Sequence, residues 1–187
     1  MTTILRVNLN DLNSQFFQDL NQKFDESAKV EIRLEGKKPH TEIFSDVQFW
    51  QVIERLDWSK KAAADILAPA TAFLATLPVA SIYLFADKLS DKLYNLDTRA
   101  HGDAYLKSEG DDYLSVDDFL YVRCAVVAEG KEYYEQVLKD PSKLSSEISF
   151  EPLLSLADHA YAQKTGKQFD YQPVFNYETY SNKKGWM

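Results

Sequence analysis

The stretch Leu93–Val127 reads LYNLDTRAHGDAYLKSEGDDYLSVDDFLYVRCAVV and decides the fold of the chain. Leading into it, apolar residues recur every three or four positions, at Ile82, Ala86, Leu89, Leu93, Leu96 and Ala100. This spacing predicts an amphipathic helix over about residues 79–101, with Gly102 as its C-terminal stop. A polar loop over residues 102–114 and a second helix over residues 116–129 are predicted to follow.

Capping residues indicate one helix inside this stretch and another before it. Ser115 with Asp118 is a capping arrangement for the helix that begins at residue 116, and Ser45 with Gln48 forms a capping box for an earlier one. Further helices are predicted over about residues 60–76, through Tyr133 to the stop at Asp140-Pro141, and from Ser149 to Gly166. The last 21 residues, 167–187, are rich in aromatic side chains without helical spacing, so we expect an extended tail that packs back on the helices.

The N-terminal residues show a different pattern. Apolar and polar residues alternate in Thr3–Leu9 and again from Val30 to Glu35, which predicts two strands around a short helix. The predicted fold class is therefore α+β, predominantly α. We expect residues 1–35 to form a strand–helix–strand head, residues 36–45 a linker, and residues 46–187 a helical domain with the extended aromatic tail. Because a lone two-stranded sheet is marginal in water, we expect the head to pair two copies in a homodimer.

Composition limits the possible functions. Of the 187 residues 45% are apolar, which is enough for a buried core, and no run of them resembles a membrane span. The net charge of −8 makes nucleic acid or an anionic membrane an improbable partner and permits a basic protein partner. The N-terminus lacks the pattern of a secretory signal and Cys124 is the only cysteine, so a cytoplasmic location is expected.

Arg123 is the first candidate for a functional residue. It is the one charged residue in Phe119–Ala128, and its helical neighbours three and four positions away are apolar. Because an unpaired buried charge is very costly, the guanidinium needs a partner from elsewhere in the molecule. That partner is either an anionic ligand or, more commonly, a carboxylate in a structural ion pair.

Asp97 and His101 are the second candidate. Four residues apart on one predicted helix, a carboxylate can orient an imidazole for proton transfer, or the two can form a weak metal site. The structural alternative is a salt bridge at a helix end. Asp97 is also a natural partner for Arg123 if the two predicted helices pack antiparallel. The candidate polar site thus consists of Asp97, His101 and Arg123.

Other chemistry finds little support in the sequence. Glu109, Asp111, Asp112, Asp117 and Asp118 do not have the spacing of a calcium loop and indicate a solvated acidic surface. Cys124 lies in an apolar run and is expected to be a small buried residue. Nucleophile-elbow, Walker and dinucleotide-binding glycine patterns are absent, so neither a metal nor a cofactor is predicted.

Several short motifs, taken in order, resemble the bacterial domain-of-unknown-function 4240 family over about residues 47–187. They are FWQVIE at 49–54, LDTR at 96–99, DFLYVR at 118–123, EGKEYY at 129–134, DP at 140–141 and YETYSNKKGW at 177–186. That resemblance implies a domain boundary but no catalytic residues. The head, with Ile-Leu-Arg-Val at 4–7, is similar to small bacterial antitoxin-like proteins, which favours dimerisation or partner binding.

Two functions remain open on these grounds. The favoured one is a non-catalytic interaction or regulatory protein, of the antitoxin or immunity kind, whose acidic surface meets a basic partner. The alternative is a small-ligand-binding protein or enzyme with a pocket around Arg123, Asp97 and His101. An open cleft at these side chains would support the second function, and a filled interface would support the first.

Overall fold

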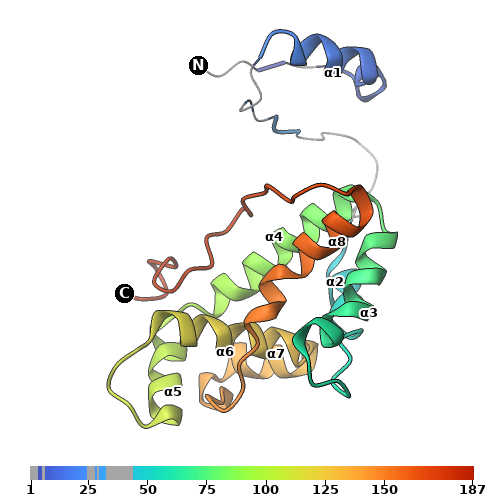
Figure 1. Ribbon diagram of the computed structural model, residues 1–187. Coiled ribbons are helices and arrows are strands. Elements are labelled where there is room, and N and C mark those ends of the chain that lie inside the picture. The colour runs from blue at the N-terminus through green and yellow to red at the C-terminus, as the bar shows by residue number, and fades with distance from the viewer. Residues whose placement is uncertain (1–3, 6, 25–27, 29, 33–43) are drawn as a thin grey trace. The chain divides into compact units, whose positions relative to one another are not determined.

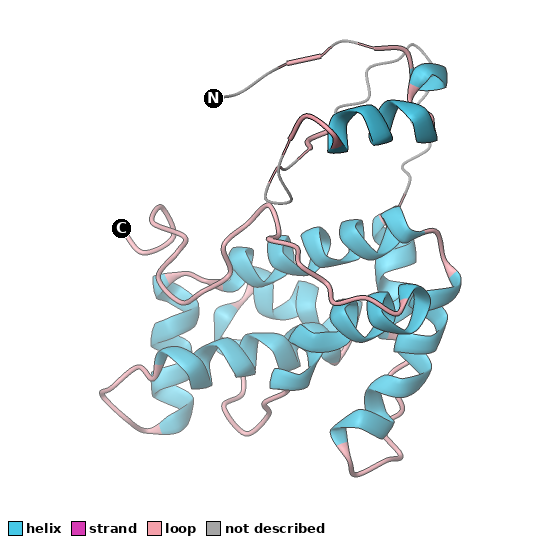
Figure 2. Ribbon diagram, turned by 45° about the horizontal axis from the view of Figure 1, so that its top comes forward, coloured by secondary structure: helices cyan, strands magenta, loops and turns pink. Residues whose placement is uncertain are grey.

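The computed structural model describes residues 4–5, 7–24, 28, 30–32 and 44–187, and all the regular secondary structure in those ranges is helical (Figures 1 and 2). The elements are η1 Leu9–Asp11, α1 Ser14–Asn21, α2 Asp46–Ile53, α3 Ala63–Thr76, α4 Val79–Leu96, α5 Arg99–Glu109, α6 Val116–Ala128, α7 Lys131–Lys139, η2 Pro141–Lys143, η3 Glu151–Ser155 and α8 Leu156–Thr165, where η denotes a 3-10 helix. The described residues contain no strand, so the predicted α+β class is wrong and the chain is mainly α.

The error lies in the N-terminal head. Residues 4–5, 7–8 and 30–32 are neither helical nor paired in a sheet, and α1 is the principal element between them. Alternating apolar and polar residues stabilise a strand only where the strand pairs with a neighbouring strand and its apolar face packs on a core. The predicted linker residues Gly36–His40 lie outside the described residues. The chain divides into two compact units, Met1–His40 and Thr41–Met187.

In the second unit, the predicted capping residues begin the helices as expected. Ser45 Oγ accepts a hydrogen bond from the amide of Gln48, and the Gln48 side chain accepts one from the amide of Ser45, which confirms the capping box of α2. Ser115 caps α6 by accepting from the amide of Asp118. Gly166 ends α8 in the left-handed conformation, at φ 69°.

The predicted helix 79–101 is in fact two helices. Thr98 Oγ1 accepts from the amide of His101 and starts α5, so α4 stops at Leu96 and Asp97 and Thr98 form the corner between them. Gly102 lies inside α5, and Gly110, at φ 75°, is the residue that ends it. The apolar stripe crosses this corner with its spacing of three and four intact, and therefore the sequence pattern did not reveal the break.

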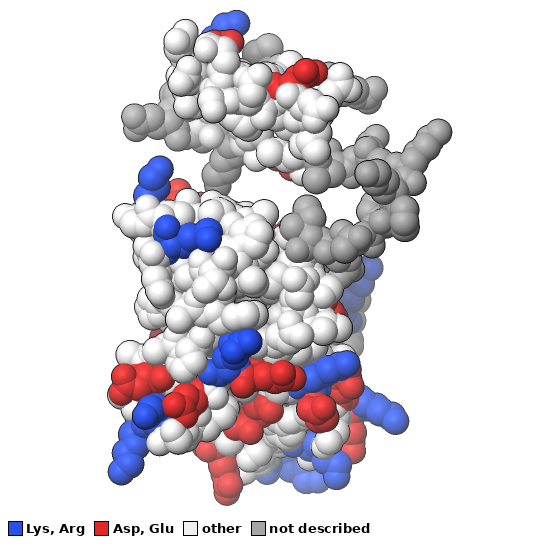
Figure 3. Space-filling model, turned by 90° about the vertical axis from the view of Figure 1, so that its right-hand side faces the viewer, with Lys and Arg blue, Asp and Glu red and all other residues white. Residues whose placement is uncertain are grey.

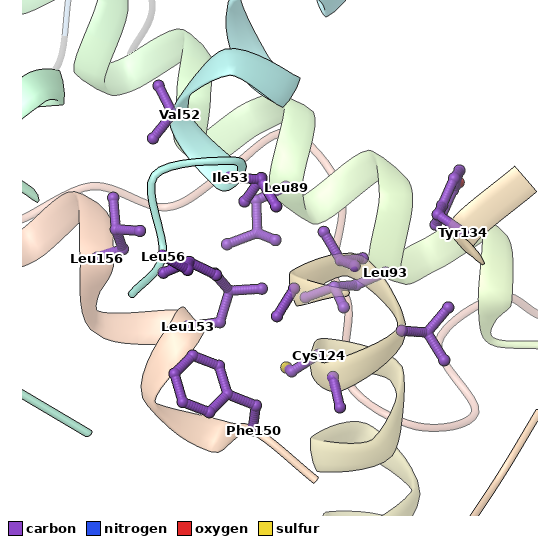
Figure 4. Close-up of a cluster of buried hydrophobic side chains, with 14 of the residues drawn as sticks. Val52, Ile53, Leu56, Leu89, Leu93, Cys124, Tyr134, Phe150, Leu153 and Leu156 are labelled. Carbon is purple, nitrogen blue, oxygen red and sulfur yellow. The ribbon is translucent and has the colours of Figure 1, made fainter. Parts of the chain in front are cut away.

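The core of the second unit is one apolar cluster to which α2, α3, α4, α6, α7 and α8 all contribute. Figure 4 shows Ile53 and Leu56, Leu89 and Leu93, Cys124, and Phe150 with Leu153 pointing toward one another from four parts of the chain. Among the helix pairs, α3 packs most extensively against α8. This cluster fixes α4 and α6 side by side; α6 carries Arg123, and Asp97 directly follows the last residue of α4.

The C-terminal segment, residues 167–187, leaves α8 and runs back along α4 to the end near α5 (Figure 1). Asp87 on α4 accepts from the Tyr171 hydroxyl at 2.9 Å and from the Val174 amide at 3.0 Å, which fixes the first half of the segment. No helix or strand forms in these residues. The segment is held by the side chains of the helices beneath it.

Charges are unevenly distributed on the second unit. On the face drawn in Figure 3, acidic and basic side chains gather on the lower part, whereas the surface over α3 carries few. The sequence agrees, since the run Ile66–Ala86 contains no charged residue. Within the described ranges, none of the helices combines the length and apolarity needed to cross a bilayer.

Candidate functional site

Asp97 is fully buried at the corner between α4 and α5, and its carboxylate binds the C-terminal segment. Oδ1 accepts from the amide of Tyr180 at 3.0 Å and from the indole Nε1 of Trp186 at 2.8 Å. Oδ2 accepts from the amide of Asn182 at 2.9 Å and from the hydroxyl of Ser181 at 3.3 Å. Both oxygens of the buried carboxylate are therefore used in shaping the turn that ends the chain.

Arg123 is also fully buried, and it holds the same segment a few residues earlier in the chain. Nη1 donates to the carbonyl of Leu93 at 2.9 Å and to the carbonyl of Tyr177 at 3.0 Å, and Nη2 donates to Thr179 Oγ1 at 2.9 Å. No ion pair joins Arg123 to Asp97, so their predicted direct pairing is wrong. The sequence pointed to a carboxylate because only side chains can be recognised as partners in a sequence. Backbone carbonyls, which every residue has, cannot be identified as partners in this way.

The electrostatics of Arg123 follow from this arrangement. Burial lowers the pKa of Arg123, and the charges of Asp97 and Glu178 act in the opposite direction. The guanidinium carbon lies 4.8 Å from the centre of the Phe119 ring, which adds a cation–π contact. Nε is buried and has no protein acceptor, so the loss of its hydration is not offset by a hydrogen bond and costs folding free energy.

His101 lies in the first turn of α5 and does not contact Asp97. Its Nδ1 is 2.7 Å from Thr98 Oγ1, and its Nε2 is 3.1 Å from the carbonyl of Val137. Since a carbonyl only accepts, these contacts assign the proton of the neutral ring to Nε2. Burial lowers the pKa of His101, the Val137 carbonyl raises it, and the charge of Arg123 lowers it further. The imidazole is buried and neutral, and each of its two nitrogens has a hydrogen-bond partner. It is therefore a structural link between α5 and α7.

The structure thus brings the three predicted residues into one buried region without joining them into a reactive group. Asp97 and Arg123 bind the C-terminal segment at different points, and His101 binds α7. The expected orientation of the imidazole by Asp97 depended on an uninterrupted helix. It fails because the chain turns at Asp97 and Thr98, so Asp97 lies in the corner after α4 while His101 lies in α5.

Other groups with chemical potential are also buried or isolated. Cys124 is completely buried, and burial raises the pKa of its thiol to about 12, although Arg123 acts the other way. His159 is exposed on α8. Among the described residues no three His, Cys, Asp or Glu side chains gather in the way that a metal ion would need.

Sequence reasoning missed the residues that complete this region. Gly185 packs so closely that a Cβ there would lie 2.8 Å from Thr98 Cγ2, and Gly102 leaves room for the Trp186 ring, 2.6 Å from the position a Cβ would take. Arg99 Nη2 donates to the Trp186 carbonyl at 2.8 Å. The run YETYSNKKGW contains most of the partners, but only its aromatic content pointed to burial.

Two hollows of similar volume lie on the surface of the described residues, and Asp97, His101 and Arg123 line neither of them. One, of about 440 Å³, lies between α4 and the C-terminal segment beside Asp87 and Lys88. The other, of about 430 Å³, lies beside Trp186 at α5. The predicted polar residues therefore line a filled interface and no open cleft.

Comparison with known proteins places the chain in a family. The model of a family described as protein of unknown function (DUF4240) matches residues 45–163, which confirms the resemblance noted in the sequence. No curated protein and no solved structure matches, and the similarity of the head to antitoxin-like proteins is not confirmed. The matched region ends before the C-terminal segment that Asp97 and Arg123 hold. The family match spans more than half of the sequence, and the chain belongs to the DUF4240 family of proteins of unknown function.

Proposed function

We propose that this protein is a non-catalytic interaction protein with a regulatory role, of the antitoxin or immunity kind, whose acidic surface binds a more basic protein. One observation carries the proposal: the polar side chains best suited to chemistry are all used to hold the molecule together. Asp97 and Arg123 are fully buried and bind the chain's own C-terminal segment. The surface of the protein is then the part left to act, by binding another protein.

The distribution of charge supports a basic partner. Residues 1–40 contain six acidic and six basic side chains, so the whole net charge of −8 belongs to residues 41–187. Within 103–118, six acidic residues face one basic residue, Lys107. Such an excess attracts and orients a positively charged partner, and the attraction weakens as salt is added. The single cysteine suits a cytoplasmic location for this encounter.

We further propose that residues 1–40 associate two copies. None of the described residues in this unit is buried, and eight large apolar side chains in it are between 38% and 82% exposed. They are Ile4, Leu5, Val7, Leu9, Phe17, Phe24, Val30 and Ile32. Because this unit carries no net charge, two copies can meet here without the repulsion expected between the acidic units.

Light scattering tests the association. We expect the full chain to have the mass of a dimer, Phe17→Asp to give a monomer, and the neighbouring Gln18→Asp to remain a dimer. Phe17 and Gln18 are both exposed on α1, so the two variants add the same charge to the same helix. Equal masses for the wild type and Phe17→Asp would contradict the proposed dimer.

Titration with two peptides of equal length, one rich in lysine and arginine and one rich in aspartate and glutamate, tests the partner. The proposal expects the basic peptide to bind at low salt and to weaken as salt rises, and the acidic peptide not to bind. A failure of both peptides to bind would contradict it. So would a thermal shift caused by phosphate or citrate that Arg123→Lys abolishes, since that result is expected of an anion site.

A further inference from the structure

The hollow beside Trp186 combines a rigid aromatic wall with carboxylates. It is bounded by α5, by the loop between α5 and α6, and by the end of the C-terminal segment, and its volume is about 430 Å³. We call it the Trp186 groove, and its lining includes Arg99, Asp103, Asp112, Tyr113, Tyr180 and Trp186. All of these elements belong to the second unit.

The aromatic wall is fixed by polar contacts of Trp186 with Asp97 and Arg99. The Trp186 indole donates to Asp97, and the carbonyl of Trp186 accepts from Arg99. The Tyr180 ring packs against the Trp186 ring with centroids 4.5 Å apart. Tyr180 is the one non-glycine residue of the described ranges with positive φ, at 70°, a conformation that the surrounding contacts must enforce.

A further lining residue of the groove, Tyr113, presents an aromatic ring to solvent. Tyr113 is 74% exposed, in the loop after α5, although it is a large side chain. Its amide donates to Asp111 Oδ1, which ties the backbone of the loop at this point. Two aromatic surfaces that line one groove can receive a flat or extended side chain between them.

The charge of the groove is negative. Asp103 and Asp112 are exposed in the lining. Burial raises the pKa of Tyr105 on α5, and the charges of Glu109, Asp118 and Asp111 raise it further. The opposing charge is that of Arg99, whose guanidinium is already bound to a carbonyl. Exposed rings with adjacent carboxylates are the environment in which a guanidinium or ammonium group is bound.

We infer that the Trp186 groove binds a lysine or arginine side chain of the basic protein partner. This inference rests on the proposed function and gives it a place on the molecule. The aliphatic part of the incoming side chain lies along Tyr180 and Trp186, and its charged end meets Asp103 and Asp112. The C-terminal segment then has two roles. It covers the buried polar residues Asp97 and Arg123, and its residues Tyr180 and Trp186 form part of the surface that recognises the partner.

The test follows the full chain by NMR during titration with a short arginine-rich peptide that has blocked ends. We expect the Trp186 indole and the Tyr113 amide to shift on binding. Asp103→Asn and Asp112→Asn should each weaken binding about fivefold, and Tyr113→Ala about threefold. Asp117→Asn is the matched control: it removes an exposed carboxylate of the same acidic region that does not line the groove, and it should leave affinity within about twofold of the wild type.

The outcomes separate the two proposals. The inference about the groove is wrong if the peptide binds but Asp103→Asn and Asp117→Asn lower its affinity equally. It is also wrong if the peptide binds and the Trp186 indole signal does not shift. In both cases the acidic surface remains the binding region. If the peptide does not bind even at low salt, the proposed basic partner fails. An acidic peptide that shifts Trp186 as strongly as the basic one would overturn the charge preference of the groove.

Discussion

The helical body, which consists of α2 to α8, and the C-terminal segment, residues 167–187, differ in the contacts that hold them in place. The body joins its helices through apolar side chains, for example Ile53, Leu93 and Leu153, which need only volume and proximity. The segment of residues 167–187 also packs aromatic rings such as Phe169 on that core. It is fixed in addition by hydrogen bonds to buried or partly buried side chains, with Asp97 and Arg123 at the centre. Apolar packing tolerates small shifts, but buried charges require each partner in place.

Arg123→Met should give the largest loss if this contrast is correct. The change leaves two carbonyls and the Thr179 hydroxyl without their donor in a buried place, so we expect about 3 kcal/mol less free energy of unfolding. Urea denaturation followed by circular dichroism measures it. Arg123→Lys keeps the charge and should lose less. An Arg123→Met protein within about 0.5 kcal/mol of the wild type would mean that the guanidinium contacts contribute no net stability.

Asp97→Asn should have the second largest effect. An amide presents a donor where the amide of Asn182 or the hydroxyl of Ser181 needs an acceptor, and we expect a loss of about 2 kcal/mol. The Trp186 fluorescence should also change, because its indole donates to this carboxylate. Asp65→Asn, an exposed carboxylate on α3, is the control and should be close to neutral. Equal losses in the two variants would remove the distinction between buried and exposed acids.

These two residues also show where sequence reasoning succeeded and where it stopped. The apolar run around Arg123 indicated its burial, since one charge among nine uncharged neighbours cannot be solvated by its own helix. Its partners could not be inferred, because they are two main-chain carbonyls and a hydroxyl far along the chain. Apolar spacing predicted most helices, but it continued unchanged across the corner at Thr98. Alternation in the head predicted strands that the described residues do not form.

Gly185→Ala tests the close packing of the segment. The new Cβ would lie 2.8 Å from Thr98 Cγ2 and 3.0 Å from the carbonyl oxygen of Asp97, so the turn must move. We expect a loss of about 1 to 2 kcal/mol in thermal or urea unfolding. Lys184→Ala changes the exposed neighbouring residue and should be nearly neutral. A stable Gly185→Ala protein with an unaltered Trp186 environment would show that the turn is not tightly packed.

His101 provides a test by pH. Burial lowers its pKa in the folded chain below the unfolded value of about 6.5, so the unfolded state binds the proton more readily. Its contribution is complete above about pH 6.5 and is lost as pH falls toward the lower folded pKa. The melting temperature should therefore drop between about pH 7.5 and 5.5, and His101→Gln should reduce that drop. An identical drop in both proteins would assign the pH dependence to other groups.

The smallest effect is expected on the surface of the helical body. Lys131 and Glu135 form an exposed pair at 3.7 Å on α7, and Lys131→Ala should change the free energy of unfolding by less than about 0.5 kcal/mol. Urea denaturation beside Arg123→Met makes the comparison directly. A loss similar to that of Arg123→Met would contradict the view that burial decides the strength of the polar contacts.

The central claim is that Asp97 and Arg123 hold the C-terminal segment, and hydrogen exchange of single amides tests it most directly. The amides of Tyr180 and Asn182 donate to Asp97, although no helix or strand protects them. We expect both amides to exchange slowly in the wild type, and to exchange much faster in Asp97→Ala while the amides of α3 and α8 stay protected. Exchange of Tyr180 and Asn182 in the wild type at the rate of an unstructured peptide would contradict the claim.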